Sequence, residues 1–321
     1  MIDEKKIIDL AQKYFINTNT DILKGIGDDC AVTKPSQFSQ LFTSDMLVEN
    51  THFLFDKIPA YLLGWKSLAV NISDIASMGG IPKYALLSLG INNKIDLNWL
   101  EQFYQGISDC AKTYQTSIIG GDTVKSAETI VINIALTGET QRPIYRDNIK
   151  NNYLILSTGY LGLSGAGFWC ITNNIENSFC IEKHNKPIPK VQEGIFLNNH
   201  IKNIAMLDSS DGLYKSIETM CEKSNLGAEI YFDNLDIHDQ LQNVCTIAKK
   251  EPEDFILYGG EDYELIFAID ENDYKSIKEE YFKKFDFDLK ILGRFTDTNK
   301  EISLIKGKSN LKIQDRSFKH L

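Results

Sequence analysis

The sequence predicts a mixed α/β (α+β) fold in two domains. Candidate strands and helices alternate along the 321 residues, which is typical of layered α/β or α+β architectures. A chain of this length accommodates two ordinary domains. A polar segment at residues 141–152 interrupts the apolar pattern. We therefore expect an N-terminal domain of residues 1–145 and a C-terminal domain of residues 146–321.

The first half alternates helical and extended patterns. Apolar residues at helical spacing predict a helix over residues 1–15 and a longer one from Pro59 to the Gly79-Gly80 pair. A third helical pattern covers residues 97–114. Short β-branched or alternating apolar runs predict strands at residues 40–48, 84–91, 116–119 and 128–138.

The second half opens with a strand at residues 153–157, which runs into a glycine-rich loop at residues 159–167. This loop could present backbone N–H groups to an anion at a helix start, or it could be a tight strand-to-helix turn; both alternatives stay open. Further helices are expected at residues 191–200, 211–223 and 273–282, and strands at residues 228–232, 263–269 and 290–292.

The composition excludes several classes of protein. Acidic residues outnumber basic ones 44 to 34, for a net charge of −10, so the protein's field repels nucleic acid and anionic membranes. No signal peptide and no apolar run of about 18 residues is present, which predicts a soluble, cytoplasmic protein. The six cysteines are spread without a C-x-x-C pair and are expected to be reduced and mostly buried.

Aspartates recur beside small residues at the ends of apolar runs. A single such aspartate is more often a helix cap or a turn residue, but the repetition favours a shared metal site. Asp74 stands apart because it lies inside a predicted helix among the apolar neighbours Ile72, Ile75 and Ala76. The acidic segments are residues 25–29, 43–45, 71–74, 120–122, 208–212 and 259–262.

Carboxylates from separate segments suit the binding of Mg²⁺ and phosphate. Mg²⁺ prefers oxygen ligands and is usually held by one or two carboxylates plus substrate phosphates. An acidic protein that binds a triphosphate needs positive charge from such ions. The chain has no G-x-x-x-x-G-K-[ST] loop, no protein-kinase motif set and no G-x-S-x-G elbow. We therefore expect nucleotide binding without a Walker loop and without a covalent nucleophile.

Read in order, these fragments resemble the thiamine-monophosphate kinase family, within the superfamily that includes aminoimidazole ribonucleotide synthetase. The resemblance covers nearly the whole chain. It rests on the motifs Gly25-Ile26-Gly27-Asp28-Asp29-Cys30-Ala31, Ser44-Asp45, Thr51-His52-Phe53, Asn71-Ile72-Ser73-Asp74, Met78-Gly79-Gly80, Gly120-Gly121-Asp122-Thr123, Asp208-Ser209-Ser210-Asp211-Gly212 and Gly259-Gly260-Glu261-Asp262-Tyr263-Glu264.

The resemblance implies a two-domain aminoimidazole ribonucleotide synthetase-like fold whose N-terminal sheets pair across a homodimer. The N-terminal domain would bind ATP and Mg²⁺, and the C-terminal domain would complete the nucleotide and substrate site. The implied reaction is direct in-line transfer of the γ-phosphoryl group of ATP to thiamine monophosphate, assisted by several Mg²⁺ ions. The products would be thiamine diphosphate and ADP.

The resemblance also implies a role for individual residues. The metal ligands would be Asp29, Thr43, Ser44, Asp45, Asp74, Asp122, Asp208 and Asp211. Gly121, Asp122, Arg146 and Ser210 would contact ATP. His52, Glu261 and Phe318 would contact thiamine monophosphate.

Two departures from the family pattern stand out. The family usually ends with Gly, an aromatic residue and Asp-His-Phe, whereas residues 315–321 here keep only the aromatic Phe318 and His320. Ser209 stands where an apolar residue is common. Two other functions stay open: a related ATP enzyme such as aminoimidazole ribonucleotide synthetase, and a catalytically inactive nucleotide-binding regulator.

Overall fold

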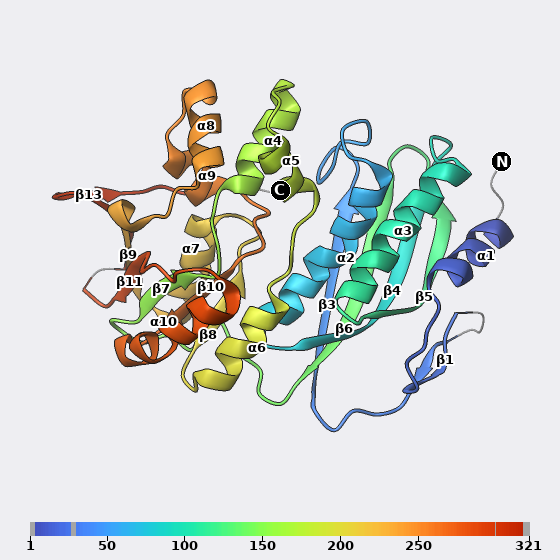
Figure 1. Ribbon diagram of the computed structural model, residues 1–321, viewed down its shortest axis with the longest axis horizontal. Coiled ribbons are helices and arrows are strands. Elements are labelled where there is room, and N and C mark those ends of the chain that lie inside the picture. The colour runs from blue at the N-terminus through green and yellow to red at the C-terminus, as the bar shows by residue number, and fades with distance from the viewer. Residues whose placement is uncertain (1–3, 27–29, 299, 317–321) are drawn as a thin grey trace. The chain divides into compact units, whose positions relative to one another are not determined.

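The computed structural model describes residues 4–26, 30–298 and 300–316 (Figure 1). The chain divides into two compact units. The first contains residues Met1–Ile75 and Gly80–Gln141, and the second contains Ala76–Gly79 and Arg142–Leu321. Each unit has its own sheet and helices, which is the mixed α/β two-domain architecture that the sequence predicts.

The first unit is built on a four-stranded sheet in the order β3-β6-β4-β5. Its strands are β3 (Ser39–Val48), β4 (Ile81–Ile91), β5 (Ser117–Lys125) and β6 (Val131–Thr140). Helices α2 (Ala60–Ser77) and α3 (Leu97–Thr113) lie over one face of this sheet (Figure 1). Helix α1 (Glu4–Tyr14) and the strand pair β1 (Ile22–Lys24) and β2 (Val32–Thr33) precede it.

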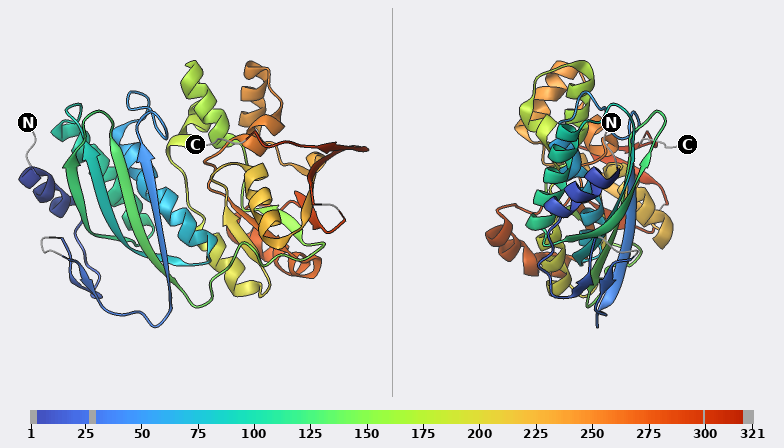
Figure 2. Two further views of the ribbon diagram at one scale, coloured as in Figure 1. Left: turned by 180° about the vertical axis from the view of Figure 1, so that it is seen from behind. Right: turned by 90° about the vertical axis from the view of Figure 1, so that its right-hand side faces the viewer.

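The other face of this sheet carries no helix in the part of the chain that the structure describes (Figure 2, left). Along β3, Leu41 and Leu47 are buried, whereas Phe42 and Met46 are 72% and 53% exposed. Successive side chains of a strand point to opposite faces, so Phe42 and Met46 lie on the uncovered side. We call this side the open face.

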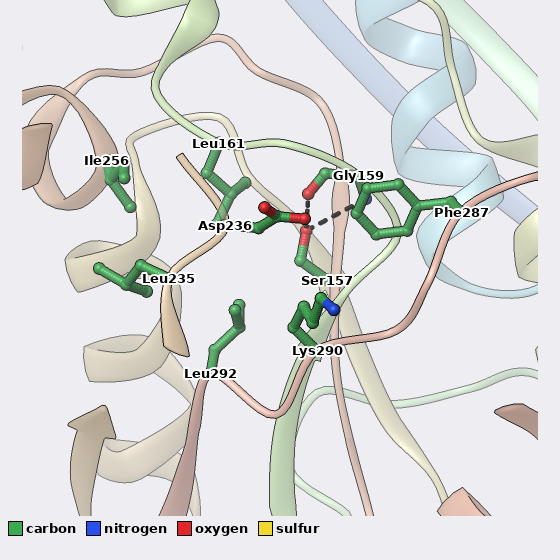
Figure 3. Close-up of a pocket in the computed structure, with 9 residues that line it drawn as sticks. All are labelled: Ser157, Gly159, Leu161, Leu235, Asp236, Ile256, Phe287, Lys290 and Leu292. Atoms are coloured by element: carbon green, nitrogen blue, oxygen red, sulfur yellow. Dashed lines mark hydrogen bonds between the residues drawn. The ribbon is translucent and has the colours of Figure 1, made fainter. Parts of the chain in front are cut away.

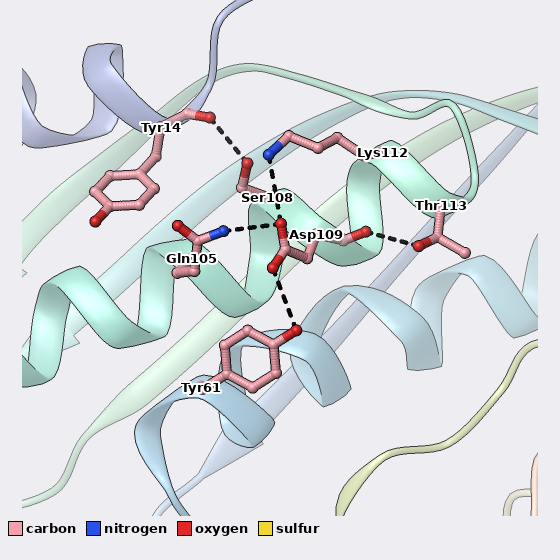
Figure 4. Close-up of polar contacts among 7 residues, drawn as sticks. All are labelled: Tyr14, Tyr61, Gln105, Ser108, Asp109, Lys112 and Thr113. Atoms are coloured by element: carbon pink, nitrogen blue, oxygen red, sulfur yellow. Dashed lines mark hydrogen bonds and ion pairs between the residues drawn. The ribbon is translucent and has the colours of Figure 1, made fainter.

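Helices α2 and α3 approach each other closely because each has a glycine at the contact. A Cβ atom on Gly64 would lie 2.0 Å from the Phe103 carbonyl oxygen, and one on Gly106 would lie 1.9 Å from that of Tyr61. Beside this contact the Tyr61 hydroxyl donates to the Asp109 carboxylate at 3.3 Å (Figure 4). The two helices therefore pack in direct contact on this face of the sheet.

An ion pair between a buried carboxylate and a half-exposed lysine stabilises the end of β3. The Glu49 carboxylate, whose side chain is 3% exposed, lies 2.7 Å from the Lys94 ammonium and accepts the Ile130 N–H at 2.9 Å. Burial alone would raise the pKa of Glu49, but these two contacts hold it below 4.5. The charged form is therefore the one that stabilises the fold.

We expect Glu49→Gln to lower the free energy of unfolding by about 1–2 kcal/mol at pH 7. Because the folded pKa is depressed, the wild-type advantage should be complete above pH 4.5 and should disappear as the pH falls through the folded pKa. Urea unfolding at several pH values measures this. Glu271→Gln, which removes an exposed pair with Lys275, is the control and should change little. A difference that persists unchanged in acid would contradict the role of the Glu49 charge.

The second unit is built on a seven-stranded sheet in the order β13-β12-β9-β11-β7-β10-β8. Strand β10 (Leu265–Ile269), which lies between β7 and the edge strand β8, is buried along its whole length. The other strands are β7 (Leu154–Ser157), β8 (Ala205–Asp208), β9 (Gly227–Tyr231), β11 (Gly293–Thr296), β12 (Ile302–Lys306) and β13 (Ser309–Lys312). The helices are α4 (Leu163–Asn173), α5 (Ser178–Asn185), α6 (Val191–His200), α7 (Leu213–Ser224), α8 (Asp239–Ala248), α9 (Pro252–Tyr258) and α10 (Glu271–Phe285).

Most predicted elements of both halves are confirmed, with boundary shifts. The strand expected at residues 290–292 is wrong, because β11 begins at Gly293. The sequence did not predict α5, α8, α9, β8, β12 or β13, whose patterns are short or carry little apolar periodicity. Five cysteines are buried and Cys30 is exposed, all of them free. Among the described residues no helix is both long and apolar enough to cross a membrane.

Candidate functional site

The first group of predicted site residues meets between β3 and α2. Thr43 and Asp45 are two apart in β3 and therefore lie on the same face of the sheet, the one that α2 covers. Asn71 and Asp74 are three apart in α2 and share one face of the helix. The Thr43 hydroxyl donates to the Asp74 carboxylate, and the Asp45 N–H donates to the Asn71 side-chain oxygen at 3.0 Å.

The two carboxylates of this group destabilise each other when both are charged. Burial, followed by the charge of Asp74, raises the pKa of Asp45 from 3.8 to about 7. A bound cation would remove both penalties by supplying the missing positive charge. Among the described residues, no cluster of three or more His, Cys, Asp or Glu side chains is placed to hold a metal ion. The donors that fit Mg²⁺ here are two carboxylates and a hydroxyl, with no nitrogen or sulfur ligand.

The other predicted metal ligands of the first unit lie apart from Asp45 and Asp74. Ser44 points to the open face, where its hydroxyl oxygen accepts from the Asn133 side-chain amide at 2.9 Å. Asp122 is exposed and belongs to β5, at the opposite edge of the sheet from β3. We expected strand residues 116–119 to end before Asp122, but β5 continues to Lys125. Within this unit the sheet therefore does not bring Asp122 to Asp45.

Asp122 instead lies at a hollow of about 160 Å³ beside the glycine pair of β5. Gly120, Gly121, Leu87 and Tyr104 line it, together with residues of α1. A Cβ atom on Gly121 would lie 1.8 Å from the Leu87 carbonyl oxygen, so this position requires glycine. Tyr104 carries no signal of a binding role in the sequence, because helix α3 shows only an ordinary amphipathic pattern.

His52 follows β3 in a tight turn. Its own N–H donates to the Val48 carbonyl at 2.9 Å, and its Nδ1 accepts the Val48 N–H at 3.0 Å. A neutral imidazole that accepts at Nδ1 carries its proton on Nε2. The turn therefore fixes His52 as an Nε2–H donor, the form that suits a hydrogen bond to a phosphate oxygen.

In the second unit, the two acidic motifs are joined through their backbones. The Ser209 N–H donates to the Glu264 carbonyl at 2.8 Å, and the Glu261 N–H donates to the Ser210 carbonyl at 2.7 Å. Glu261 has a positive φ of 65°, an uncommon conformation for a non-glycine residue that is often stored at functional sites. The motifs at residues 208–212 and 259–264 therefore form one structural element, which holds Asp208, Ser210, Asp211 and Glu261.

The glycine-rich loop does meet an anion, but that anion belongs to the chain itself. The Asp262 carboxylate accepts the Gly162 N–H at 2.6 Å and the Ser164 N–H at 2.9 Å, at the start of α4. Burial raises the pKa of Asp262 to about 7 despite these two bonds. The Ser164 hydroxyl lies 3.1 Å from His184 Nδ1, which lies 3.4 Å from the Glu261 carboxylate. His184 thus orients Glu261.

Ser209 is fully buried, and its hydroxyl has no hydrogen-bond partner among the described residues. We expect Ser209→Ala to raise the free energy of unfolding by about 1 kcal/mol, because the unsatisfied hydroxyl is removed, and to raise the melting temperature by roughly 2–4 °C. Differential scanning calorimetry measures this. Ser276→Ala, an exposed position, is the control and should change little; a lower melting temperature for Ser209→Ala would contradict the expectation.

The remaining predicted residues differ in their surroundings. Arg146 is exposed and so remains accessible to a phosphate. Asp29 and Phe318 lie outside the described residues. Sequence reasoning missed Asn71, His184 and Asp262, although the first and last lie inside motifs that it had singled out.

Comparison with known proteins shows to which class of protein the chain belongs. The model of the AIR synthase related protein N-terminal domain matches residues 27–140, and the model of the corresponding C-terminal domain matches residues 150–306. These two matches follow the two halves of the chain and identify it as an AIR synthase related protein.

Relatives that match most of the chain identify the family within this class of protein. The chain is 34% identical to the thiamine-monophosphate kinase of Buchnera aphidicola subsp. Schizaphis graminum over 97% of this chain and 98% of that one. It is 34% identical to that of Bacillus subtilis over 80% of each chain. A solved structure described as AaThiL complexed with AMPPCP and TMP matches with a TM-score of 0.79 and 29% identity, over 99% of this chain and 97% of that one. The chain belongs to the thiamine-monophosphate kinase family.

Proposed function

We propose that this protein transfers the γ-phosphoryl group of ATP to the phosphate of thiamine monophosphate. The bond between the β,γ-bridging oxygen and the γ-phosphorus of ATP breaks, a bond from a substrate phosphate oxygen to that phosphorus forms, and ADP leaves. The observation that carries this proposal is the 34% identity over 97% of the chain with a thiamine-monophosphate kinase. The match to a complex with AMPPCP and TMP supports both substrates.

We propose that Asp45, Asp74 and Thr43 hold Mg²⁺. When bound, Mg²⁺ would neutralise the charge of the triphosphate in this acidic protein. Two carboxylates and a hydroxyl are enough, because Mg²⁺ keeps waters and takes its other ligands from substrate phosphates. The raised pKa of Asp45 supports a need for a cation. Metal roles for Asp29, Ser44, Asp122, Asp208 and Asp211 remain part of the proposal.

The chain's own residues position the substrates, since phosphoryl transfer leaves little covalent chemistry to the protein. Gly121 and Asp122, at the hollow on β5, bind the nucleotide together with Ser210 and Arg146, whose guanidinium suits bidentate phosphate contacts. His52 donates from Nε2 to the substrate phosphate. Glu261, oriented by His184, and Phe318 complete the contacts with thiamine monophosphate.

We further propose that the open face of the first unit's sheet is covered by a second copy of the chain. The face carries Phe42, Met46, Leu86 and Val124, which are 72%, 53%, 44% and 55% exposed. Exposed apolar patches of this kind mark interaction sites. Analytical ultracentrifugation should find a dimer that Phe42→Asp converts to monomer. A wild-type monomer at micromolar concentration would contradict this proposal.

A direct assay tests the function. Purified protein with ATP, Mg²⁺ and thiamine monophosphate should form thiamine diphosphate and ADP in equal amounts, as chromatography of both products measures. Omitting thiamine monophosphate should abolish ADP release. ATP binding without any turnover would instead support a regulator, and ADP release that yields no thiamine diphosphate would support another enzyme of this superfamily.

A further inference from the structure

The segment that carries Glu261 has an irregular and strained backbone. It joins α9 to β10, and its residues 259–264 belong to neither a helix nor a strand. Two of its non-glycine residues, Glu261 and Tyr263, have positive φ angles of 65° and 52°. Such conformations are costly and persist only where the surrounding contacts hold them. The contacts that hold this segment therefore decide where the Glu261 side chain points.

Glu264, the last residue of this segment, is bound by three separate parts of the second unit. Its backbone carbonyl accepts the Ser209 N–H at 2.8 Å. Its carboxylate accepts the Thr158 hydroxyl at 2.7 Å and lies 3.2 Å from the Lys190 ammonium. The Thr158 hydroxyl oxygen in turn accepts the Leu265 N–H at 2.9 Å. Glu264 therefore fixes the position of the segment relative to the other acidic motif, the end of β7 and the start of α6.

The turn after β7 is shaped to receive the Glu264 carboxylate. The Ser157 hydroxyl donates to the Gly159 carbonyl at 2.6 Å and accepts the Gly159 N–H at 3.2 Å, which closes the turn around Thr158 (Figure 3). A Cβ atom on Gly159 would lie 2.6 Å from the carboxylate oxygens of Glu264. The turn therefore admits this carboxylate only because residue 159 is glycine.

Lys190 is the cationic partner of this carboxylate. Its side chain is 20% exposed and that of Glu264 is 13% exposed, so the pair is largely removed from water. Burial alone would lower the pKa of Lys190, but the charges of Glu264 and Glu193 outweigh burial and raise the pKa. Lys190 is the N-cap residue of α6, so its backbone is held by a helix. The ion pair is therefore charged and attached to a regular element of the fold.

We propose that Lys190 is a positioning residue of the substrate site, which by pairing with Glu264 keeps Glu261 directed toward thiamine monophosphate. The inference rests on the proposed function, in which Glu261 contacts this substrate. A shift of Glu264 reaches Glu261 through the short strained backbone between them, where the Tyr263 N–H is bonded to the Ser209 carbonyl at 3.0 Å. Without the lysine, the unpaired carboxylate turns toward water and this backbone relaxes.

Binding of thiamine monophosphate in the absence of ATP tests the inference without turnover. Lys190→Met keeps the length of the side chain but removes its charge, and isothermal titration calorimetry should find a Kd raised about tenfold. Lys190→Arg retains the charge and should keep the Kd within about twofold of the wild type. Lys275→Met is the matched control, because it removes an exposed ion pair with Glu271 on α10. Its Kd should equal that of the wild type.

A double variant separates positioning from stability. Lys190→Met leaves a buried carboxylate unpaired, so its melting temperature should fall. Lys190→Met/Glu264→Gln removes both charges and should recover most of the lost stability. Its Kd should stay raised, because the side chain at position 264 has no cation to hold it. A double variant that regains both the stability and the Kd of the wild type would show that the pair only stabilises the fold, and would overturn the inference.

Steady-state kinetics separate this inference from the proposed function. In Lys190→Met, KM for thiamine monophosphate should rise about tenfold while kcat stays near that of the wild type, because binding common to the ground state and the transition state is lost. A wild type that makes thiamine diphosphate, with a folded Lys190→Met variant whose Kd and KM are unchanged, would overturn the inference and leave the function intact. A wild type whose binding of thiamine monophosphate depends on Lys190, but which makes no thiamine diphosphate, would support the inference and overturn the function.

Discussion

Replacing Asp45 with asparagine should reduce kcat/KM for phosphoryl transfer at least about 100-fold, the size expected when one preorganised charge contact is lost. The same variant should be more stable than the wild type without metal. Asp45 is partly buried beside Asp74, and its pKa is raised from 3.8 to about 7. Since one pKa unit is worth 1.36 kcal/mol, the charged form destabilises the fold by up to roughly 4 kcal/mol. Steady-state assays and thermal melts at pH 8 measure both effects.

The pH dependence of the stability gain in Asp45→Asn follows from the linkage between proton binding and folding. A carboxyl group whose folded pKa is raised binds its proton more tightly when folded, so stability falls as the pH rises from 3.8 to about 7. The gain of Asp45→Asn should therefore be full above pH 7 and vanish below pH 4. The exposed Asp56 provides the control, because Asp56→Asn should change neither property. A less stable Asp45→Asn variant that keeps full turnover would refute the proposed metal role.

Mg²⁺ with a non-hydrolysable ATP analogue should raise the melting temperature of the wild type by mass action. The same addition should raise that of Asp45→Asn much less, because a proposed ligand is missing. This comparison needs no turnover. Equal shifts in both proteins would show that Asp45 does not contribute to metal-nucleotide binding.

Replacing Gly106 with alanine should lower the free energy of unfolding by more than about 3 kcal/mol. The new Cβ atom would lie 1.9 Å from the Tyr61 carbonyl oxygen, so α3 has to move away from α2. That movement opens the contact around Phe103, which is fully buried. Because α2 also carries Asp74, turnover should fall with stability. Urea unfolding and the yield of folded protein measure the loss.

The matched control is Gly90→Ala, in strand β4 of the same unit. Its Cβ atom would meet Val131 at 3.4 Å, an ordinary contact, so its stability should change by less than about 0.5 kcal/mol. Gly64→Ala, with its Cβ atom 2.0 Å from the Phe103 carbonyl oxygen, should behave like Gly106→Ala. A Gly106→Ala protein as stable as the control would contradict the close helix contact.

Long helices and strands could be predicted because their apolar periodicity is continuous. Helix α2 is an example: the sequence predicted its start after Pro59 and its end at the Gly79-Gly80 pair, where Gly79 has a φ of +66°. The short helices α5, α8 and α9, of 8, 10 and 7 residues, could not be predicted, because periodicity over so few residues does not distinguish a helix from a strand or a loop. The partner of the glycine-rich loop could not be predicted either. The Asp262 carboxylate that accepts the Gly162 N–H is 100 residues away in the chain.

The sequence by itself determined the class of fold, the alternation of elements and the acidic motifs, because these depend on local periodicity and residue chemistry. The tertiary structure alone decided which acids meet. The two-residue period of β3 turns Thr43 and Asp45 toward Asp74 and turns Ser44 away, while the strand order β3-β6-β4-β5 leaves Asp122 at the far edge. Strand order and helix placement arise from packing between distant segments, which no local pattern encodes.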